Sequence, residues 1–119
     1  MLKECIFVLP VLDNSGESLD RVHLAAKRVL GAIFNGYTVI EAEGAWYDRA
    51  THQTLTEKVR RYVVAIKEEQ ETELRQYAIS LANRADQLAV YFVGFSGEAE
   101  IIDLGGNTGR DISSHYARA

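Results

Sequence analysis

Aromatic rings and carboxylates are concentrated between positions 37 and 62 of the chain. A ring face attracts a cation through its quadrupole, and a nearby carboxylate supplies the compensating charge, so this pattern favours a site for a small cationic ligand. Each residue alone also has an ordinary structural explanation as a cross-strand pair or a solvated acid. The set is Tyr37, Glu41, Glu43, Trp46, Tyr47, Asp48, Glu57 and Tyr62.

Glu57 is the carboxylate that we expect to be held most rigidly. It lies near the start of a predicted strand at 56–66, where side chains alternate between the two faces of a sheet. One face of this strand carries Lys58, Arg60, Tyr62 and Val64, and the other carries Glu57, Val59, Arg61 and Val63.

Hydrophobic periodicity predicts two helices that support these strands. Apolar residues at helical spacing run from 19 to 33 and end at Asn35-Gly36, a helix stop signal. An acidic cluster at 68–73 suits a helix N-terminus, because carboxylates there oppose the helix dipole. The stripe that follows is Leu74, Tyr77, Ala78, Leu81, Ala82 and Ala85.

Five apolar or β-branched segments predict strands. We expect them at 4–9, 37–43, 56–66, 87–93 and 98–104, with a hairpin turn at 94–97 and a long hairpin connection at 45–53 whose edges can extend the strands. The order is β-α-β-β-α-β with an added terminal strand, which predicts a ferredoxin-like α+β fold with an antiparallel sheet and both helices on one face.

Such a sheet leaves its other face bare. We expect part of its apolar alternation to be exposed there, and a homo-oligomer, as a dimer or cyclic trimer, to cover it. The positions concerned are Ile6, Val8, Val39, Val63, Val90 and Phe92.

Length and composition restrict the possible classes of protein. The 119 residues predict one domain at 1–104, followed by a glycine-rich polar tail at 105–119. The net charge of −4 gives no electrostatic footprint for nucleic acid, and a single cysteine favours a reduced cytoplasm. We expect no membrane span and no cofactor. The histidines His23, His52 and His115 lack ligand partners at metal-binding spacing, which predicts no metal and ordinary surface or boundary histidines.

The order of elements, with a long loop at 44–55, resembles the PII-like trimeric superfamily. This resemblance implies a homotrimer with small-molecule sites in the clefts between protomers. The connection at 83–86 is short and lacks a glycine-rich basic loop, so ATP sensing is not expected.

Within that architecture, four short segments are similar to the bacteriophage enzymes that degrade S-adenosylmethionine: Asp13-Asn14, Gly36-Tyr37, Thr56-Glu57-Lys58 and the strand at 89–93. The resemblance implies a lyase in which the substrate's own carboxylate attacks its side chain, releasing methylthioadenosine and homoserine lactone. Glu57 matches the carboxylate of that family and becomes the candidate catalytic residue. The candidates for substrate binding are Tyr37, Glu41, Trp46, Tyr47 and Tyr62.

A second function remains open at this point. The chain is equally compatible with a non-catalytic PII-like module that binds a small ligand or a protein partner. In that case the aromatic residues of the long connection, Trp46 and Tyr47, would form an exposed anchor with Asp48.

Overall fold

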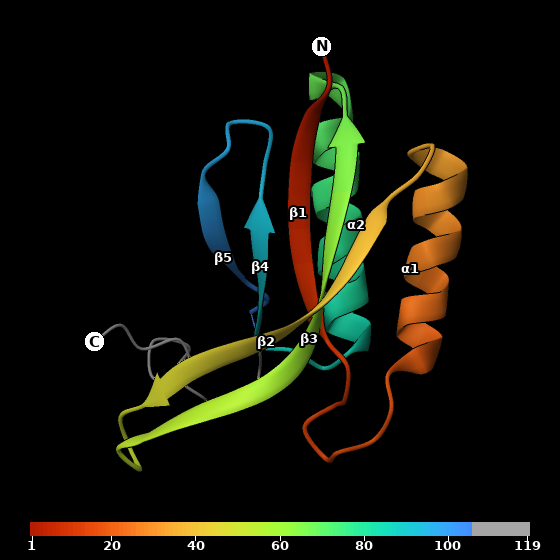
Figure 1. The fold of residues 1–119 in the computed structure, drawn as a ribbon. Coiled ribbons are helices and arrows are strands. Elements are labelled where there is room, and N and C mark those ends of the chain that lie inside the picture. The colour runs from red at the N-terminus through yellow and green to blue at the C-terminus, as the bar shows by residue number, and fades with distance from the viewer. Residues whose placement is uncertain (106–119) are drawn as a thin grey trace.

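The computed structural model describes residues 1–105, which form five strands, two α-helices and one short 3-10 helix (Figure 1). The order of elements is the predicted one. The bounds are β1 Lys3–Pro10, α1 Asp20–Ile33, β2 Thr38–Asp48, β3 Gln53–Ile66, η1 Glu68–Gln70, α2 Glu71–Arg84, β4 Ala89–Val93 and β5 Ala99–Asp103.

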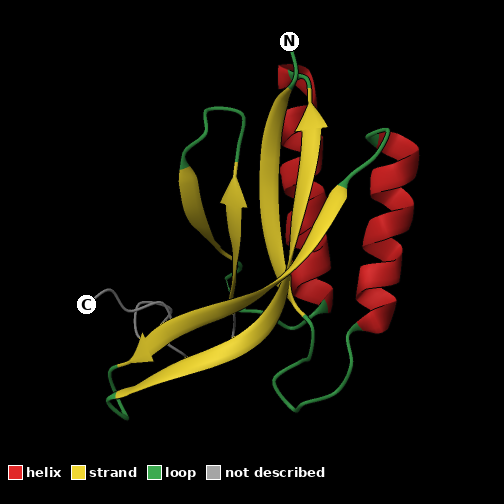
Figure 2. Cartoon of the chain, viewed as in Figure 1, coloured by secondary structure: helices red, strands yellow, loops and turns green. Residues whose placement is uncertain are grey.

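The sheet has the strand order β2-β3-β1-β4-β5, and each neighbouring pair is antiparallel. Both helices lie on the same side of it (Figure 2). The first four strands and the two helices form the ferredoxin-like unit, and β5 extends the sheet beside β4. The predicted fold class is therefore confirmed.

The main core fills the space between the helices and one side of the sheet, called here the helix face. This side carries Cys5, Phe7 and Leu9 of β1, all fully buried. Phe7 lies opposite both Tyr62 of β3 and Phe92 of β4, and its ring stacks on Tyr62 at a centroid distance of 5.0 Å. Because α1 and α2 follow the predicted helical stripes, they close this face with Ala26, Leu30, Leu74, Ala78, Leu81 and Ala82.

The long loop predicted at 44–55 is shorter in the structure, because its edges extend the two strands. The ladder between β2 and β3 continues past Gly44, pairing Trp46 with Leu55 and Tyr47 with Thr54, so that only residues 49–52 form the turn. Glycine weakens a strand, but aromatic cross-strand pairs beyond it restore pairing energy. Residues 43–58 thus form a two-stranded arm that projects beyond the helices (Figure 1).

The opposite side of the sheet, called here the open face, has no helix over it. It carries Ile6, Val8 and Val63, each partly exposed, as expected. Val39, Val90 and Phe92 were also expected there, but the register places them on the helix face, where they belong to or pack against the core. Large exposed side chains on the open face are Ile40 and Tyr91, at 42% and 38% exposure.

His23 differs from the expectation of an ordinary surface or boundary histidine. It is the one polar residue among residues 1–105 that is buried as deeply as the core, with 1% of its surface exposed. Its position on α1 beside the apolar stripe points it under the sheet rather than toward solvent.

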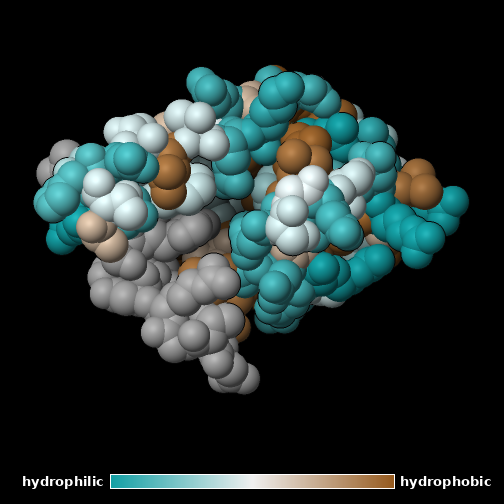
Figure 3. All heavy atoms as spheres, turned by 90° about the horizontal axis from the view of Figure 1, so that it is seen from below, coloured by the Kyte–Doolittle hydropathy of each residue, from teal (hydrophilic) through white to brown (hydrophobic). Residues whose placement is uncertain are grey.

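The surface of the described residues seen from below is mostly hydrophilic, with separate hydrophobic patches (Figure 3). No helix within residues 1–105 is long and apolar enough to cross a membrane. His115 and all but the first residue of the predicted tail at 105–119 lie outside the described residues.

Candidate functional site

Glu57 lies in the arm, opposite Gly44 of β2 and on the same strand face as Val59. Its side chain is half-buried, and this desolvation raises the pKa of the carboxyl above its ordinary value of 4.5. Within residues 1–105 the carboxylate makes no ion pair and no hydrogen bond. A partly buried carboxylate without a partner among the described residues is the kind of group that functional sites use, which makes Glu57 a candidate.

A cleft of about 130 Å³ opens beside Glu57 on the open face. Two aromatic residues, Trp46 of the arm and Tyr91 of β4, line it together with the amide side chain of Gln87. A methyl group added at Gly44 would meet Val59 at 3.5 Å, an ordinary contact, so the cleft has room at this point. The apolar wall consists of Val8, Pro10, Val59 and Ala89.

The register of four strands brings this cleft together. Pro10 of β1 lies opposite Val59 of β3, and Phe7 lies opposite Phe92 of β4, which places Tyr91 beside Val8 on the open face. The sequence analysis missed Tyr91 and Gln87. Strict alternation along 89–93 could have assigned Tyr91 to the face opposite Phe92, whereas Gln87 comes from a loop and carries no periodic signal.

A second cavity, of about 570 Å³, also borders Glu57 and lies between the arm and the loop that joins β1 to α1. Asp13 organises this loop, since one of its oxygens accepts hydrogen bonds from the Ser15 hydroxyl and from the backbone N–H groups of Ser15 and Glu17. These bonds, led by the Ser15 hydroxyl, lower the pKa of Asp13. The described lining of this cavity contains no aromatic ring.

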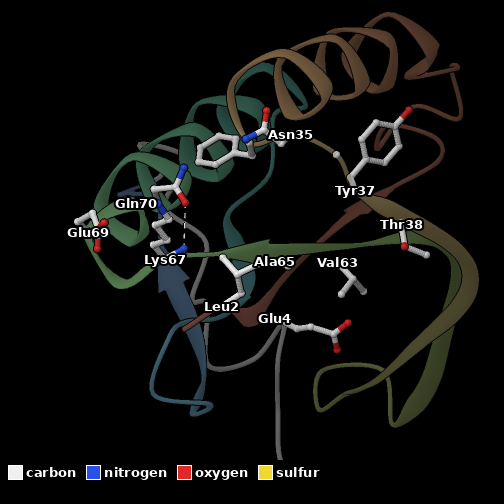
Figure 4. Close-up of a pocket in the computed structure, with 12 residues that line it drawn as sticks. Leu2, Glu4, Asn35, Tyr37, Thr38, Val63, Ala65, Lys67, Glu69 and Gln70 are labelled. Carbon is white, nitrogen blue, oxygen red and sulfur yellow. Dashed lines mark hydrogen bonds between the residues drawn. The ribbon is translucent and has the colours of Figure 1, made fainter.

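Tyr37 lines a different cavity, of about 630 Å³, at the other end of β3 (Figure 4). Asn35 and Tyr37 form one wall, and Lys67 and Gln70 form another. The neighbouring Thr38 pairs with Val63, six residues along the strand from Glu57, which corresponds to about 20 Å of extended chain. The structure therefore does not bring Tyr37 and Glu57 into one site.

Three further candidates from the sequence lie away from the cleft. Tyr62 is fully buried on the helix face. Glu41 is largely exposed and forms an ion pair with Arg60, with 3.1 Å between carboxylate oxygen and guanidinium nitrogen. Tyr47 reaches the tip of the arm, where its hydroxyl lies 3.0 Å from Nδ1 of His52. Of the five predicted ligand contacts, Trp46 alone shares the cleft with Glu57.

No group of three or more histidine, cysteine, aspartate or glutamate side chains among residues 1–105 is arranged to hold a metal ion. Cys5 is a free thiol in the core, and burial raises its pKa. The chemistry available at the cleft is therefore that of a carboxylate, two aromatic rings and an amide.

No protein-family model matches the chain, and no curated protein matches it in sequence. Two solved structures share its fold. A phage SAM lyase in complex with S-methyl-5'-thioadenosine is 13% identical, with a TM-score of 0.61 over 84% of this chain and 88% of that chain. A phage SAM lyase in the apo state is 15% identical, with a TM-score of 0.58 over 84% of this chain and 87% of that chain. At these identities the similarity establishes the shared fold.

Proposed function

We propose that this protein cleaves S-adenosylmethionine to methylthioadenosine and homoserine lactone, with Glu57 as the charged group of the site. The observation that carries the proposal is the half-buried Glu57 carboxylate, which has no partner among residues 1–105 and lies beside Trp46 and Tyr91. A cationic ligand would neutralise the carboxylate, and the rings offer a surface for the adenine base and the cationic part. The shared fold with phage SAM lyases supports this choice of ligand.

The reaction needs no external base. A carboxylate oxygen of the substrate attacks its own Cγ, the Cγ–S bond breaks, and its electron pair passes to sulfur, which leaves as a neutral thioether. Most of the catalysis comes from binding the substrate in a folded conformation in which these atoms meet. The conformational entropy is then lost on binding and does not add to the barrier of the reaction. The positive charge on sulfur disappears in this step, whereas the substrate ammonium keeps its charge. Glu57 is therefore best used to hold the ammonium end.

The aromatic cleft beside Glu57 is small by itself, since its volume of about 130 Å³ is below the roughly 300 Å³ at which sites for drug-sized ligands begin. The cavity of about 570 Å³ that also borders Glu57 has no aromatic ring in its described lining. The surrounding open face bears exposed apolar side chains, including Ile40 and Tyr91. We therefore propose that further copies of the chain, as a homotrimer, pack on the open face and complete the site.

The direct test is to incubate the purified protein with S-adenosylmethionine and to measure methylthioadenosine and homoserine lactone by chromatography and mass spectrometry. The wild-type protein should form both products in equal amounts, above the spontaneous background. For Glu57→Gln we expect kcat/KM to fall at least about 100-fold, because the substrate loses its anchoring charge.

Glu73→Gln is the matched control, since it removes the same charge from an exposed position on α2. Its activity should equal that of the wild-type protein. Absence of product from the wild-type protein would refute the lyase. If the protein then bound S-adenosylmethionine without turnover, the observation would favour the alternative of a small-ligand-binding module.

A further inference from the structure

The buried His23 connects α1 to two strands of the sheet. Its Nε2 lies 2.7 Å from the carbonyl oxygen of Pro10, at the end of β1. Its Nδ1 lies 2.6 Å from the hydroxyl oxygen of Tyr62 on β3, and the two rings stack with an interplanar angle of 14°. The imidazole thus uses both nitrogens, and within the described residues no buried side-chain polar atom lacks a hydrogen-bond partner.

The chemistry of the two partners fixes the proton positions. A carbonyl oxygen can only accept, so Nε2–H of His23 donates to Pro10. Burial lowers the pKa of His23 and keeps the ring neutral, which leaves Nδ1 as an acceptor. Burial also raises the pKa of Tyr62 to about 12, so its hydroxyl stays protonated and donates to Nδ1.

The Pro10 carbonyl belongs to the same planar peptide group as the N–H of Val11. That N–H donates to the carbonyl oxygen of Lys58 at 3.0 Å. Lys58 is the residue that follows Glu57 in the arm. One rigid peptide is therefore held at both ends, by His23 on the helix side and by the arm on the other. Pro10 itself also lines the Glu57 cleft.

We propose that His23 is a positioning residue of the Glu57 cleft, which it acts on through the Pro10–Val11 peptide. The expected effect of His23 on turnover rests on the proposed function. The expected effect of His23 on the Pro10–Val11 peptide does not depend on any activity. His23 does not line the cleft, so it acts by fixing the Pro10 wall and the backbone after Glu57, and not by touching substrate.

Two reciprocal substitutions separate the two bonds of the imidazole. In His23→Gln the side-chain amide nitrogen can occupy the place of Nε2, which keeps the bond to Pro10 and loses the bond to Tyr62. In His23→Asn the amide group occupies the place of Nδ1, which keeps the bond to Tyr62 and loses the bond to Pro10. Each variant loses one buried hydrogen bond, so their losses of stability should be similar.

Tyr77→Phe provides a third variant of the same kind. It removes a hydrogen bond of 2.9 Å from the Tyr77 hydroxyl to the carbonyl of Ala25, which joins α2 to α1 within the helix layer. This variant perturbs the helices without touching the Pro10–Val11 peptide.

The first readout is hydrogen exchange of the Val11 amide, compared with the slowest amides of the same variant. We expect Val11 exchange to accelerate in His23→Asn relative to those amides, and to remain as in the wild-type protein in His23→Gln and Tyr77→Phe. Equal behaviour of the two His23 variants would overturn the proposal, whether or not the protein is a lyase.

The second readout is turnover of S-adenosylmethionine. In His23→Asn we expect kcat to fall about 10-fold or more with a smaller change in KM, because displaced groups no longer align the bound substrate. His23→Gln and Tyr77→Phe should retain activity close to that of the wild-type protein. An equal loss of kcat in all three variants would reduce His23 to a structural role. A wild-type protein without activity would refute the proposed function and leave the exchange result to decide.

Discussion

The two faces of the sheet differ in how deeply their side chains are buried and in whether the polar ones have hydrogen-bond or ion-pair partners. On the helix face, Phe7 and Tyr62 are fully buried and stacked, and even the polar His23 has partners for both nitrogens. On the open face, apolar side chains are partly exposed and Glu57 lies half-buried without a partner among the described residues. The contrast indicates that the helix face holds the fold together, whereas the open face leaves apolar surface and a carboxylate without partners among the described residues.

We expect the largest difference in stability between substitutions at two neighbouring residues of β1 whose side chains point to opposite faces. Leu9→Ala removes a fully buried side chain from the helix face and should lower the free energy of unfolding by about 2–5 kcal/mol. Val8→Ala removes a partly exposed side chain from the open face and should cost roughly 1 kcal/mol. Urea denaturation of both variants measures the difference. Equal losses would contradict the division between the faces.

A charge placed on the open face should change the oligomeric state. Ile40 is 42% exposed there, so Ile40→Lys should leave the fold intact while it prevents apolar packing between copies. Native mass spectrometry should show a trimer for the wild-type protein and smaller species for the variant. Leu24→Lys, at a position on α1 that is 51% exposed, is the control and should not change the mass. A monomeric wild-type protein would refute the shared site.

Removal of the Glu57 charge should not destabilise the protein. Burial raises the pKa of this carboxyl because the charged form is poorly solvated, and no described residue compensates it. Thermal unfolding of Glu57→Gln at pH 7 should therefore give a melting temperature equal to or above that of the wild-type protein. A marked decrease would show that Glu57 has a structural partner and would weaken its assignment to function.

The smallest effect is a pH dependence that arises on the helix face. Burial lowers the pKa of His23 below its ordinary value of 6.5, so the unfolded chain binds a proton before the folded protein does. The stability contributed by neutral His23 should be complete above about pH 6.5 and decrease as the pH falls toward the lowered pKa. Between about pH 7.5 and pH 5, a range that spans the ordinary histidine pKa of about 6.5, the free energy of unfolding should decline more steeply for the wild-type protein than for His23→Gln. Parallel curves would contradict this origin.

Much of the fold could be predicted from the sequence, because the signals are local. The helical stripe at 74–85 and the alternation around Tyr62 repeat within a few residues, and the structure buries the stripe as expected and one of the two alternating sides of the strand. The length of the loop at 44–55 was overestimated because the signals are local. A glycine in a strand pattern is a local stop signal, whereas the ladder beyond Gly44 depends on pairing with the partner strand.

The candidate site could be predicted only in part from the sequence. The clustering of acids and rings along the chain selected Glu57 and Trp46, which share one cleft, but it also selected Tyr37, which lines a different cavity, and Tyr62, which is in the core. Proximity in sequence does not place side chains in one site, because Tyr62 lies on the opposite face of β3 from Glu57 and Tyr37 lies near the other end of that strand. Tyr91 joined the cleft through strand order, which no local pattern encodes.

The sequence by itself determined the fold class and which residues share one side of each element, because periods of two and 3.6 residues reflect the burial of one side. It did not determine which side of each strand faces the helices. Only the tertiary structure decided what stands next to Glu57, how far the arm extends and that His23 is buried between Pro10 and Tyr62. These features arise where β1, β3, β4 and α1 meet. They depend on contacts between residues that are distant in the chain. Such contacts form only when the register of the whole sheet is set.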